Sequence, residues 1–267
     1  MFIRFIENLR SKIVNLQSEI IMSKFQFKQF SLEQDRCAMK IGTDGVLLGA
    51  WAPLSHQPFS ILDIGTGTGI IALMLAQRSN AEQIDALEIE ENAYEQATDN
   101  FEASPWNERL FCFHAGLDEF MEEPEDDPSD NELAQQYDLI VSNPPFYAED
   151  YKTNDNQRDL ARFQDALPFE DLIEAADLLL SENGILAVII PFKEEARFLA
   201  LANEFELYPT HVTRVKGTPT TETKRSLLAL SRNKIDNSTI DELVIEIGRH
   251  EYTPEYIALT KDFYIKM

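Results

Sequence analysis

Apolar residues along the chain gather in short runs that alternate with segments of helical periodicity. Runs typical of buried strands lie at 61–64, 84–89, 109–114, 137–142 and 185–190. Helical spacing follows at 70–78, from Pro168 to Gly184 and at 194–203. This alternation predicts a doubly wound, mostly parallel sheet. Because 207–215 and 226–231 predict a terminal antiparallel pair, the expected fold class is α/β and Rossmann-like with an antiparallel C-terminal strand.

The N-terminal part adds smaller elements to this core. Residues 1–21 have the spacing of an amphipathic helix, and Met22 follows at once, so this segment is either an ordinary helix or an extension ahead of the natural start. Residues 25–37 alternate in part like a short hairpin. Thr43 or Asp44 is expected to cap a helix that runs to Trp51. With no repeat or linker evident, we expect 22–267 to form a single domain.

A glycine-rich turn joins the first buried run to its helix, in the order Asp63, Ile64, Gly65, Thr66, Gly67, Thr68, Gly69. Glycines suit such a turn because a Cβ would keep the backbone away from a ligand lying across the helix N-terminus. The spacing Gly-x-Gly-x-Gly differs from the dinucleotide fingerprint Gly-x-Gly-x-x-Gly and resembles the S-adenosylmethionine turn of class I methyltransferases. The Asp63 carboxylate would suit a sulfonium and an ammonium, directly or through water. The alternative is that the turn only connects the strand to the helix and binds no ligand.

Two further acids are candidates for cofactor contacts. Glu88 ends the second run, about twenty residues after the turn, where the ribose hydroxyls of a nucleotide-like cofactor are usually bound. Its alternative role is that of a solvated residue opening the next helix, which Glu90 and Glu91 suit better. Asp44 is placed either at the methionine end of the cofactor, beside Thr43, or simply as a helix cap.

The tetrapeptide Asn143-Pro144-Pro145-Phe146 follows the strand at 137–142, and so lies at the carboxyl edge of the sheet, where doubly wound folds bind their ligands. The amine of a nucleobase is a poor nucleophile because its lone pair is delocalised into the ring. If the Asn143 side chain and the Pro144 carbonyl accept its two protons, the lone pair turns toward an incoming methyl group. Phe146 would stack on the flipped base. The alternative is a strand end stopped by prolines.

The net charge of the chain is unusual for a protein that acts on nucleic acid. The 267 residues are 44% apolar and 10% aromatic, which suits a globular domain, but the formal net charge is −24. Part of this charge comes from 118–132, which we expect to be a solvated or disordered acidic loop. Two polar stretches offer basic residues for phosphate contacts, or are merely solvated loops: Lys152, Arg158 and Arg162 in one, and Lys224 and Arg225 in the other.

The cysteines and histidines bear on whether the protein has disulfides, a cysteine nucleophile or a metal site. Cys37 and Cys112 form no Cys-x-x-Cys pair, which predicts a reducing compartment, taken as the cytoplasm, and no disulfide framework. Neither has the context of a cytosine-C5 nucleophile, and four scattered histidines predict no metal site. No signal peptide or membrane span is expected.

Four blocks together carry a specific resemblance. Gln34–Trp51, Asp63–Gly69, Asn143–Phe146 and Tyr252–Tyr264 are similar to the bacterial tRNA1(Val) adenine-N6-methyltransferase family, a likeness that covers roughly 24–267. It implies methyl transfer from S-adenosylmethionine to the adenine just 3′ of the anticodon of a valine tRNA, with no DNA or membrane partner and an unspecified oligomeric state. The departure is Gly116, which stands where such enzymes often carry an acid for the cofactor adenine, so Asp118 is the substitute candidate.

Three other functions fit parts of the pattern. The same Asn-Pro-Pro edge can position a protein glutamine amide for N5-methylation, although the two terminal blocks argue against it. DNA adenine methylation is disfavoured because no target-recognition domain is evident. A non-catalytic scaffold that binds the cofactor and RNA has no need of an intact Asn143-Pro144-Pro145-Phe146.

Overall fold

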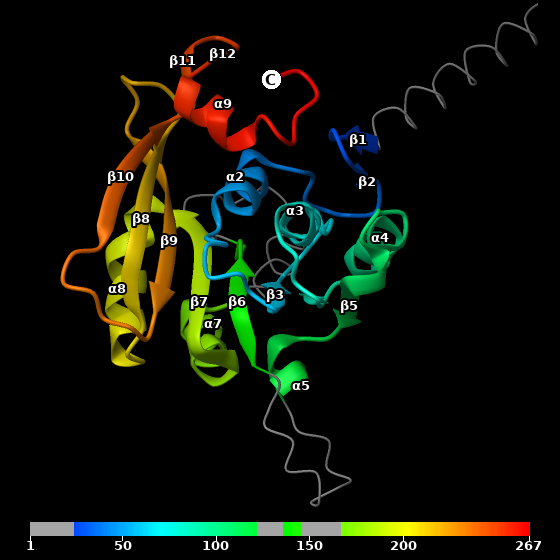
Figure 1. Ribbon diagram of the computed structural model, residues 1–267, viewed down its shortest axis with the longest axis horizontal. Helices are drawn as coiled ribbons and strands as arrows, with labels where there is room; N and C mark the ends of the chain where they lie inside the picture. The colour runs from blue at the N-terminus through cyan, green and yellow to red at the C-terminus, as the bar shows by residue number, and fades with distance from the viewer. Residues whose placement is uncertain (1–23, 122–135, 146–166) are drawn as a thin grey trace, which may run out of the picture.

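The computed structural model describes residues 24–121, 136–145 and 167–267. Within these ranges one eight-stranded sheet has the order β10-β8-β9-β7-β6-β3-β4-β5 (Figure 1). Its strands are β3 (Ser60–Ile64), β4 (Gln83–Glu88), β5 (Leu110–His114), β6 (Tyr137–Ser142), β7 (Leu180–Pro191), β8 (Tyr208–Lys216), β9 (Thr223–Ser231) and β10 (Thr239–Val244). Only β9 runs against its neighbours, so the expected α/β fold with an antiparallel C-terminal strand is confirmed.

Helices cover both faces of the sheet. They are α2 (Thr43–Trp51), α3 (Ile70–Arg78), α4 (Glu91–Glu102), α5 (Leu117–Met121), α7 (Phe169–Leu179), α8 (Glu195–Glu204) and α9 (Pro254–Thr260), with short 3₁₀ turns at η1 (Asn107–Arg109) and η2 (Phe192–Glu194). Successive side chains of a strand point to opposite faces. Accordingly Ile61 packs into one core with α2, α3 and α4, whereas Leu62 packs into a second core with α7 and α8.

The two terminal blocks meet each other. The hairpin of β1 (Lys24–Gln26) and β2 (Ser31–Glu33) is antiparallel, as expected. Phe27 forms a bridge with Tyr264, and the N–H of Lys28 donates to the Phe263 carbonyl at 2.8 Å. A small ladder of β11 (Glu246–Gly248) and β12 (Glu251–Tyr252) leads into α9, which lies beside α2 (Figure 1).

Several expectations about element boundaries are corrected. The helix after Pro168 ends at Leu179 rather than Gly184, because Leu180 already pairs with Tyr137 of β6. The pair β8 and β9 is antiparallel but not terminal, since β10 adds a parallel edge strand to β8. The acidic stretch begins in α5 rather than in a loop, and its residues 122–135 lie outside the described ranges, as does the helix expected at 1–21.

In the ranges that the structure describes, no helix combines the length and apolarity needed to cross a bilayer.

Candidate active site

The glycine turn lies at the carboxyl end of β3 and is held to the neighbouring strand. The N–H groups of Gly65 and Thr66 both donate to the Leu87 carbonyl at 3.0 Å. Gly65, Gly67 and Gly69 have φ values of 73°, 57° and 80°, a region that favours glycine. A Cβ built at Gly65 or Gly67 would meet no atom within 4 Å, so this side of the turn faces open space. A ligand can therefore approach the backbone closely there.

The last glycine of the turn, Gly69, is required for a different reason. A Cβ at Gly69 would lie 2.5 Å from a ring carbon of Phe101 on α4. The glycine is thus required twice, by its left-handed φ and by the close packing of α4 against the start of α3. Helix α4 consequently fixes where the turn ends.

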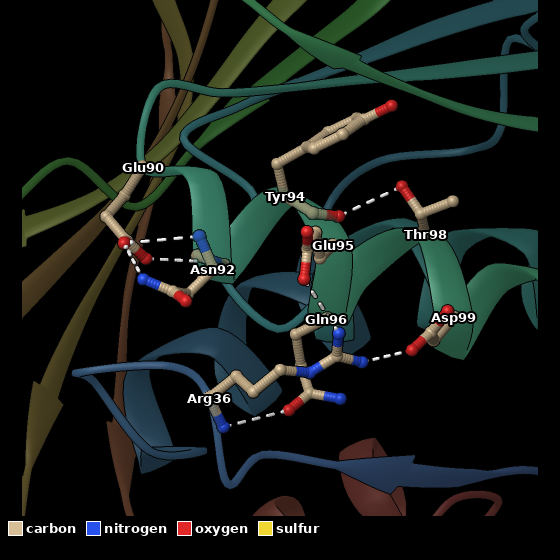
Figure 2. Close-up of polar contacts among 9 residues, drawn as sticks. Arg36, Glu90, Asn92, Tyr94, Glu95, Gln96, Thr98 and Asp99 are labelled. Atoms are coloured by element: carbon tan, nitrogen blue, oxygen red, sulfur yellow. Dashed lines mark hydrogen bonds and ion pairs between the residues drawn. The ribbon is translucent and has the colours of Figure 1, made fainter.

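Glu88 lies beside the turn with its carboxylate already ordered. One carboxylate oxygen accepts the N–H of Gly67 at 2.8 Å and the other accepts the N–H of Glu90 at 2.9 Å. The residue is 9% exposed. Burial raises the pKa of Glu88, while these main-chain hydrogen bonds oppose the rise. Glu88 ends β4, and Glu90 takes the helix-capping role by accepting from Asn92 and Ala93 (Figure 2).

Asp63 lies beneath the turn rather than on its open side. Its Oδ2 accepts from the Thr66 hydroxyl at 2.6 Å and from the Ala72 N–H at 3.2 Å, and the residue is fully buried. Its Oδ1 has no hydrogen-bond partner among the described residues. Burial raises the pKa of Asp63 to about 7, although the Thr66 and Ala72 hydrogen bonds favour the charged form. Asp63 and Thr66 therefore brace the turn from inside.

Asn143 lies next to the glycine turn because their strands are neighbours. Ile64 of β3 is in register with Ser142 of β6, so both chains leave the sheet at the same level. The Ser142 hydroxyl donates to the Ile64 carbonyl at 2.9 Å, which ties the two strand ends together. Asn143 is half-buried and Pro144 is buried. The glycine turn and the Asn143 amide thus lie next to each other at one edge of the sheet.

Comparisons with known proteins agree with this arrangement. The family model for the methyltransferase small domain matches residues 46–216. A protein of Flavobacterium johnsoniae named tRNA1(Val) (adenine(37)-N6)-methyltransferase is 77% identical over 243 residues, 91% of this chain and 100% of the relative. The chain belongs to this methyltransferase family. A relative of the same name from Flavobacterium psychrophilum is 74% identical over the same shares of both chains.

A solved structure supports the fold alone. The crystal structure of a predicted O-methyltransferase from Agrobacterium tumefaciens aligns with a TM-score of 0.60 at 18% identity, covering 82% of this chain and 96% of the other. The class I methyltransferase fold is therefore shared beyond the family.

The start of α2 differs in detail from the expectation. Neither Thr43 nor Asp44 caps the helix, because Gly42 occupies the cap position and Thr43 is already helical. Thr43 is exposed, whereas the Asp44 carboxylate accepts a hydrogen bond from Arg225 Nε at 2.8 Å. Two residues predicted for different ligands, Asp44 for the cofactor and Arg225 for RNA, are thus ion-paired in this methyltransferase.

Of the remaining predicted residues, some lie within the ranges that the structure describes and others lie outside them. Asp118 is exposed in the first turn of α5, near Asp171 of α7. Burial and the negative charge of Asp118 both raise the pKa of Asp171. Gly116 faces Ile89, which is 57% exposed and offers an apolar contact beyond Glu88. Lys224 is exposed on β9. The predicted residues outside the described ranges are Phe146, Lys152, Arg158 and Arg162.

Cysteine chemistry is absent from the described site. Burial raises the pKa of the Cys37 thiol to about 11 and that of Cys112 to about 12, so both stay protonated at neutral pH. Neither is a thiolate nucleophile. In the parts of the chain that the structure covers, no cluster of histidine, cysteine, aspartate and glutamate could hold a metal ion.

Sequence reasoning missed two polar residues that hold the site together. Ser142 has no sequence signal, because its role depends on the register of β6 with β3. Asn100 is 3% exposed on the buried face of α4 and donates to the Thr68 carbonyl of the turn at 2.9 Å. An amide on the packed face of a helix, as at Gln96 and Asn100, is a usable signal, since buried polar groups require partners.

Proposed function

We propose that this chain transfers a methyl group from S-adenosylmethionine to the exocyclic N6 amine of adenine 37, beside the anticodon, in tRNA1(Val). The curated relatives carry this activity in their names, which supports the reaction and the substrate. The observation that carries the proposal is the register of Ile64 with Ser142, since it sets the glycine turn beside Asn143. Residues 22–267 are proposed to act as one domain, in the cytoplasm where tRNA resides.

The residues around the turn fit the cofactor. The open side of Gly65 and Gly67 leaves room for a ligand against the backbone, and Glu88 offers carboxylate oxygens for both ribose hydroxyls. To bind the ribose in this way, the Glu88 oxygens must share or exchange their present main-chain hydrogen bonds. When bound, S-adenosylmethionine supplies an electrophilic methyl group. Thr43 and Asp44 are proposed near its methionine end, and Asp118 near its adenine. Asp63, which is buried beneath the turn, is proposed to support the methionine end through Thr66 rather than by direct contact.

The acceptor amine is positioned by Asn143 and Pro144. Their side-chain and main-chain carbonyls accept its two protons, which releases the lone pair from the ring and directs it at the methyl group. Pro145 stiffens the backbone that carries these acceptors, and Phe146 is proposed to stack on the base. Catalysis rests on placement, because the product ammonium loses its proton readily and no pair of carboxylates is required.

Contacts to the tRNA backbone are proposed for the basic residues of two segments, Lys152, Arg158 and Arg162 and then Lys224 and Arg225. Lys224 is exposed and Arg225 lies at the carboxyl edge, opposite Pro191 in the β7–β9 ladder. A net charge of −24 demands that such residues gather near the site. We expect binding to weaken steeply with salt.

The test is a methyl-transfer assay with tritiated S-adenosylmethionine, purified protein and bulk tRNA from a strain that lacks the activity. Nucleoside analysis should find N6-methyladenosine confined to valine tRNA. Label in other bases, or in a protein fraction instead of tRNA, would contradict the proposed substrate, and the second result would favour the glutamine amide.

A further inference from the structure

Helix α4 contacts two parts of the chain that are distant in sequence. On one side lies the glycine turn, on the other the segment 33–41, which runs from β2 toward Thr43 and Asp44. Both contacts are made by side chains of one buried face of α4, through Gln96 and Asn100. The two parts therefore meet at this helix.

Asn100 is the side chain that touches both parts. Its Oδ1 accepts the N–H of Glu33 at 2.8 Å, and its Nδ2 donates to the carbonyls of Glu33 and Thr68, each at 2.9 Å. With both amide protons and the oxygen in use, the side chain has a single orientation. One amide thus sets the distance between the turn and the start of the segment.

Gln96 lies one helical turn earlier and forms a hydrogen bond to the segment. Its Oε1 accepts the N–H of Arg36 at 3.1 Å, and it is 1% exposed. Arg36 also reaches Glu95 at 3.2 Å and Asp99 with its guanidinium, on the solvent side of α4 (Figure 2). Gln96 is therefore a matched control for Asn100: a buried amide on the same helix face, hydrogen-bonded to the same segment and, within the described chain, not hydrogen-bonded to the turn.

The segment is also closed by its own hydrogen bonds. Gln34 Oε1 accepts the N–H of Ile41 at 2.8 Å, and Lys40 Nζ donates to the Cys37 carbonyl at 3.1 Å. These hydrogen bonds connect the two ends of the segment, so an anchor at Glu33 also constrains Ile41, two residues ahead of Thr43. The segment thereby links Asn100 to the start of α2, where Asp44 is also held by its ion pair with Arg225.

We propose that Asn100 is a positioning residue for the cofactor, which couples the glycine turn to the segment that carries Thr43 and Asp44. The inference rests on the proposed function only in assigning that turn to S-adenosylmethionine. The bound cofactor is expected to contact both sides of this link. Removing the amide therefore loosens both walls of the cofactor site at once.

The test compares Asn100→Ala and Asn100→Asp with Gln96→Ala by calorimetric titration with S-adenosylhomocysteine. Asn100→Asp keeps the acceptor for Glu33 and loses both donated hydrogen bonds. We expect both Asn100 variants to weaken binding about tenfold or more, and Gln96→Ala by less than about twofold at a similar loss in Tm. The KM for S-adenosylmethionine should rise in the Asn100 variants, whereas the KM for tRNA and the kcat at saturating cofactor stay within about twofold.

Two outcomes overturn the inference. One is an affinity loss that follows Tm equally in the Asn100 and Gln96 variants, and the other is unchanged affinity in Asn100→Ala. If the variants do not fold, hydrogen exchange of the wild type decides, because S-adenosylhomocysteine should protect the amides of both 65–69 and 33–41. Protection of the turn alone rejects the coupling. A wild type that binds S-adenosylhomocysteine but leaves tRNA unmethylated contradicts the proposed function and not this inference.

Discussion

The Glu88 carboxylate accepts the main-chain N–H of Gly67 at 2.8 Å, so the acid that ends β4 orders the glycine turn that follows β3. The two parts of the proposed cofactor site are therefore connected by a hydrogen bond of the protein itself. Such preorganisation lowers the entropy lost on binding. It also means that a change at Glu88 affects both the ribose contact and the turn.

Replacing Glu88 should impair cofactor binding more than turnover. Glu88→Ala removes the hydrogen bonds to Gly67 and Glu90 together with the ribose ligand, and we expect S-adenosylhomocysteine to bind about tenfold or more weakly. Titration calorimetry measures this directly. The control is Glu90→Ala, which removes a helix cap and should lower stability by about 1 kcal/mol with little effect on affinity. Equal affinity losses in both variants would contradict a ligand role for Glu88.

Asn143 should show the opposite behaviour. Asn143→Ala removes an acceptor for the amine protons, and we expect kcat to fall by about 100-fold or more, as when a preorganised polar group is lost from a transition state. Binding of S-adenosylhomocysteine should stay within about twofold, because the residue is proposed to touch the acceptor base alone. Single-turnover methyl transfer and calorimetry together test this. Simultaneous loss of both quantities would mean that Asn143 supports the fold of the edge instead.

Asp63 should make stability depend on pH. Its folded pKa of about 7 lies above the ordinary 3.8, so the folded state binds the proton more tightly than the unfolded state does. The stability that the bound proton contributes to the folded state is complete below about pH 4 and is lost as pH rises through 7. Asp63→Asn cannot ionise, so the difference in unfolding free energy between variant and wild type should shift in favour of the variant across this window. Urea titrations at pH 4 to 8 measure the difference, and a constant one would contradict the raised pKa.

The ion pair between Arg225 and Asp44 separates two roles of the arginine. If Arg225 contacts tRNA, Arg225→Ala should raise the KM for tRNA severalfold and reduce the salt dependence of binding, since phosphate contacts release counterions. Asp44→Ala leaves the guanidinium in place, so the KM for tRNA should not rise. Filter binding at several salt concentrations provides the measurement. Equal losses of tRNA affinity in both variants would show that the pair acts only in maintaining the edge.

The packing of Gly69 against Phe101 predicts a large cost for one methyl group. Gly69→Ala combines a φ of 80° with a Cβ 2.5 Å from the Phe101 ring, and we expect a loss of about 2–4 kcal/mol. Gly217→Ala is the control, because its Cβ would meet its nearest atom at 3.7 Å and its φ lies outside the left-handed region. Denaturant unfolding of both variants measures the difference. A loss below about 1 kcal/mol for Gly69→Ala would show that α4 shifts readily to make room for the added methyl group.

Local signals explain why much of the fold followed from the sequence. The helix at 70–78 and the strand at 137–142 have the expected bounds, because their apolar spacing and flanking residues depend on neighbours along the chain. The helix after Pro168 ended early for the opposite reason: Leu180 pairs with Tyr137 of a distant strand, and that pairing overrides local helical spacing. The strand β10 was missed because it gains its place only as a partner of β8.

The sequence by itself determined the glycine turn, the acid at 88 and the tetrapeptide that begins at Asn143, since each is a local pattern. It also determined the family, which rests on four such patterns taken together. Tertiary structure decided which of these groups are neighbours. The register of Ile64 with Ser142, the pairing of Asp44 with Arg225 and the double contact of Asn100 all join residues far apart in the chain. Such contacts arise from strand order and helix packing, which no local pattern of residues encodes.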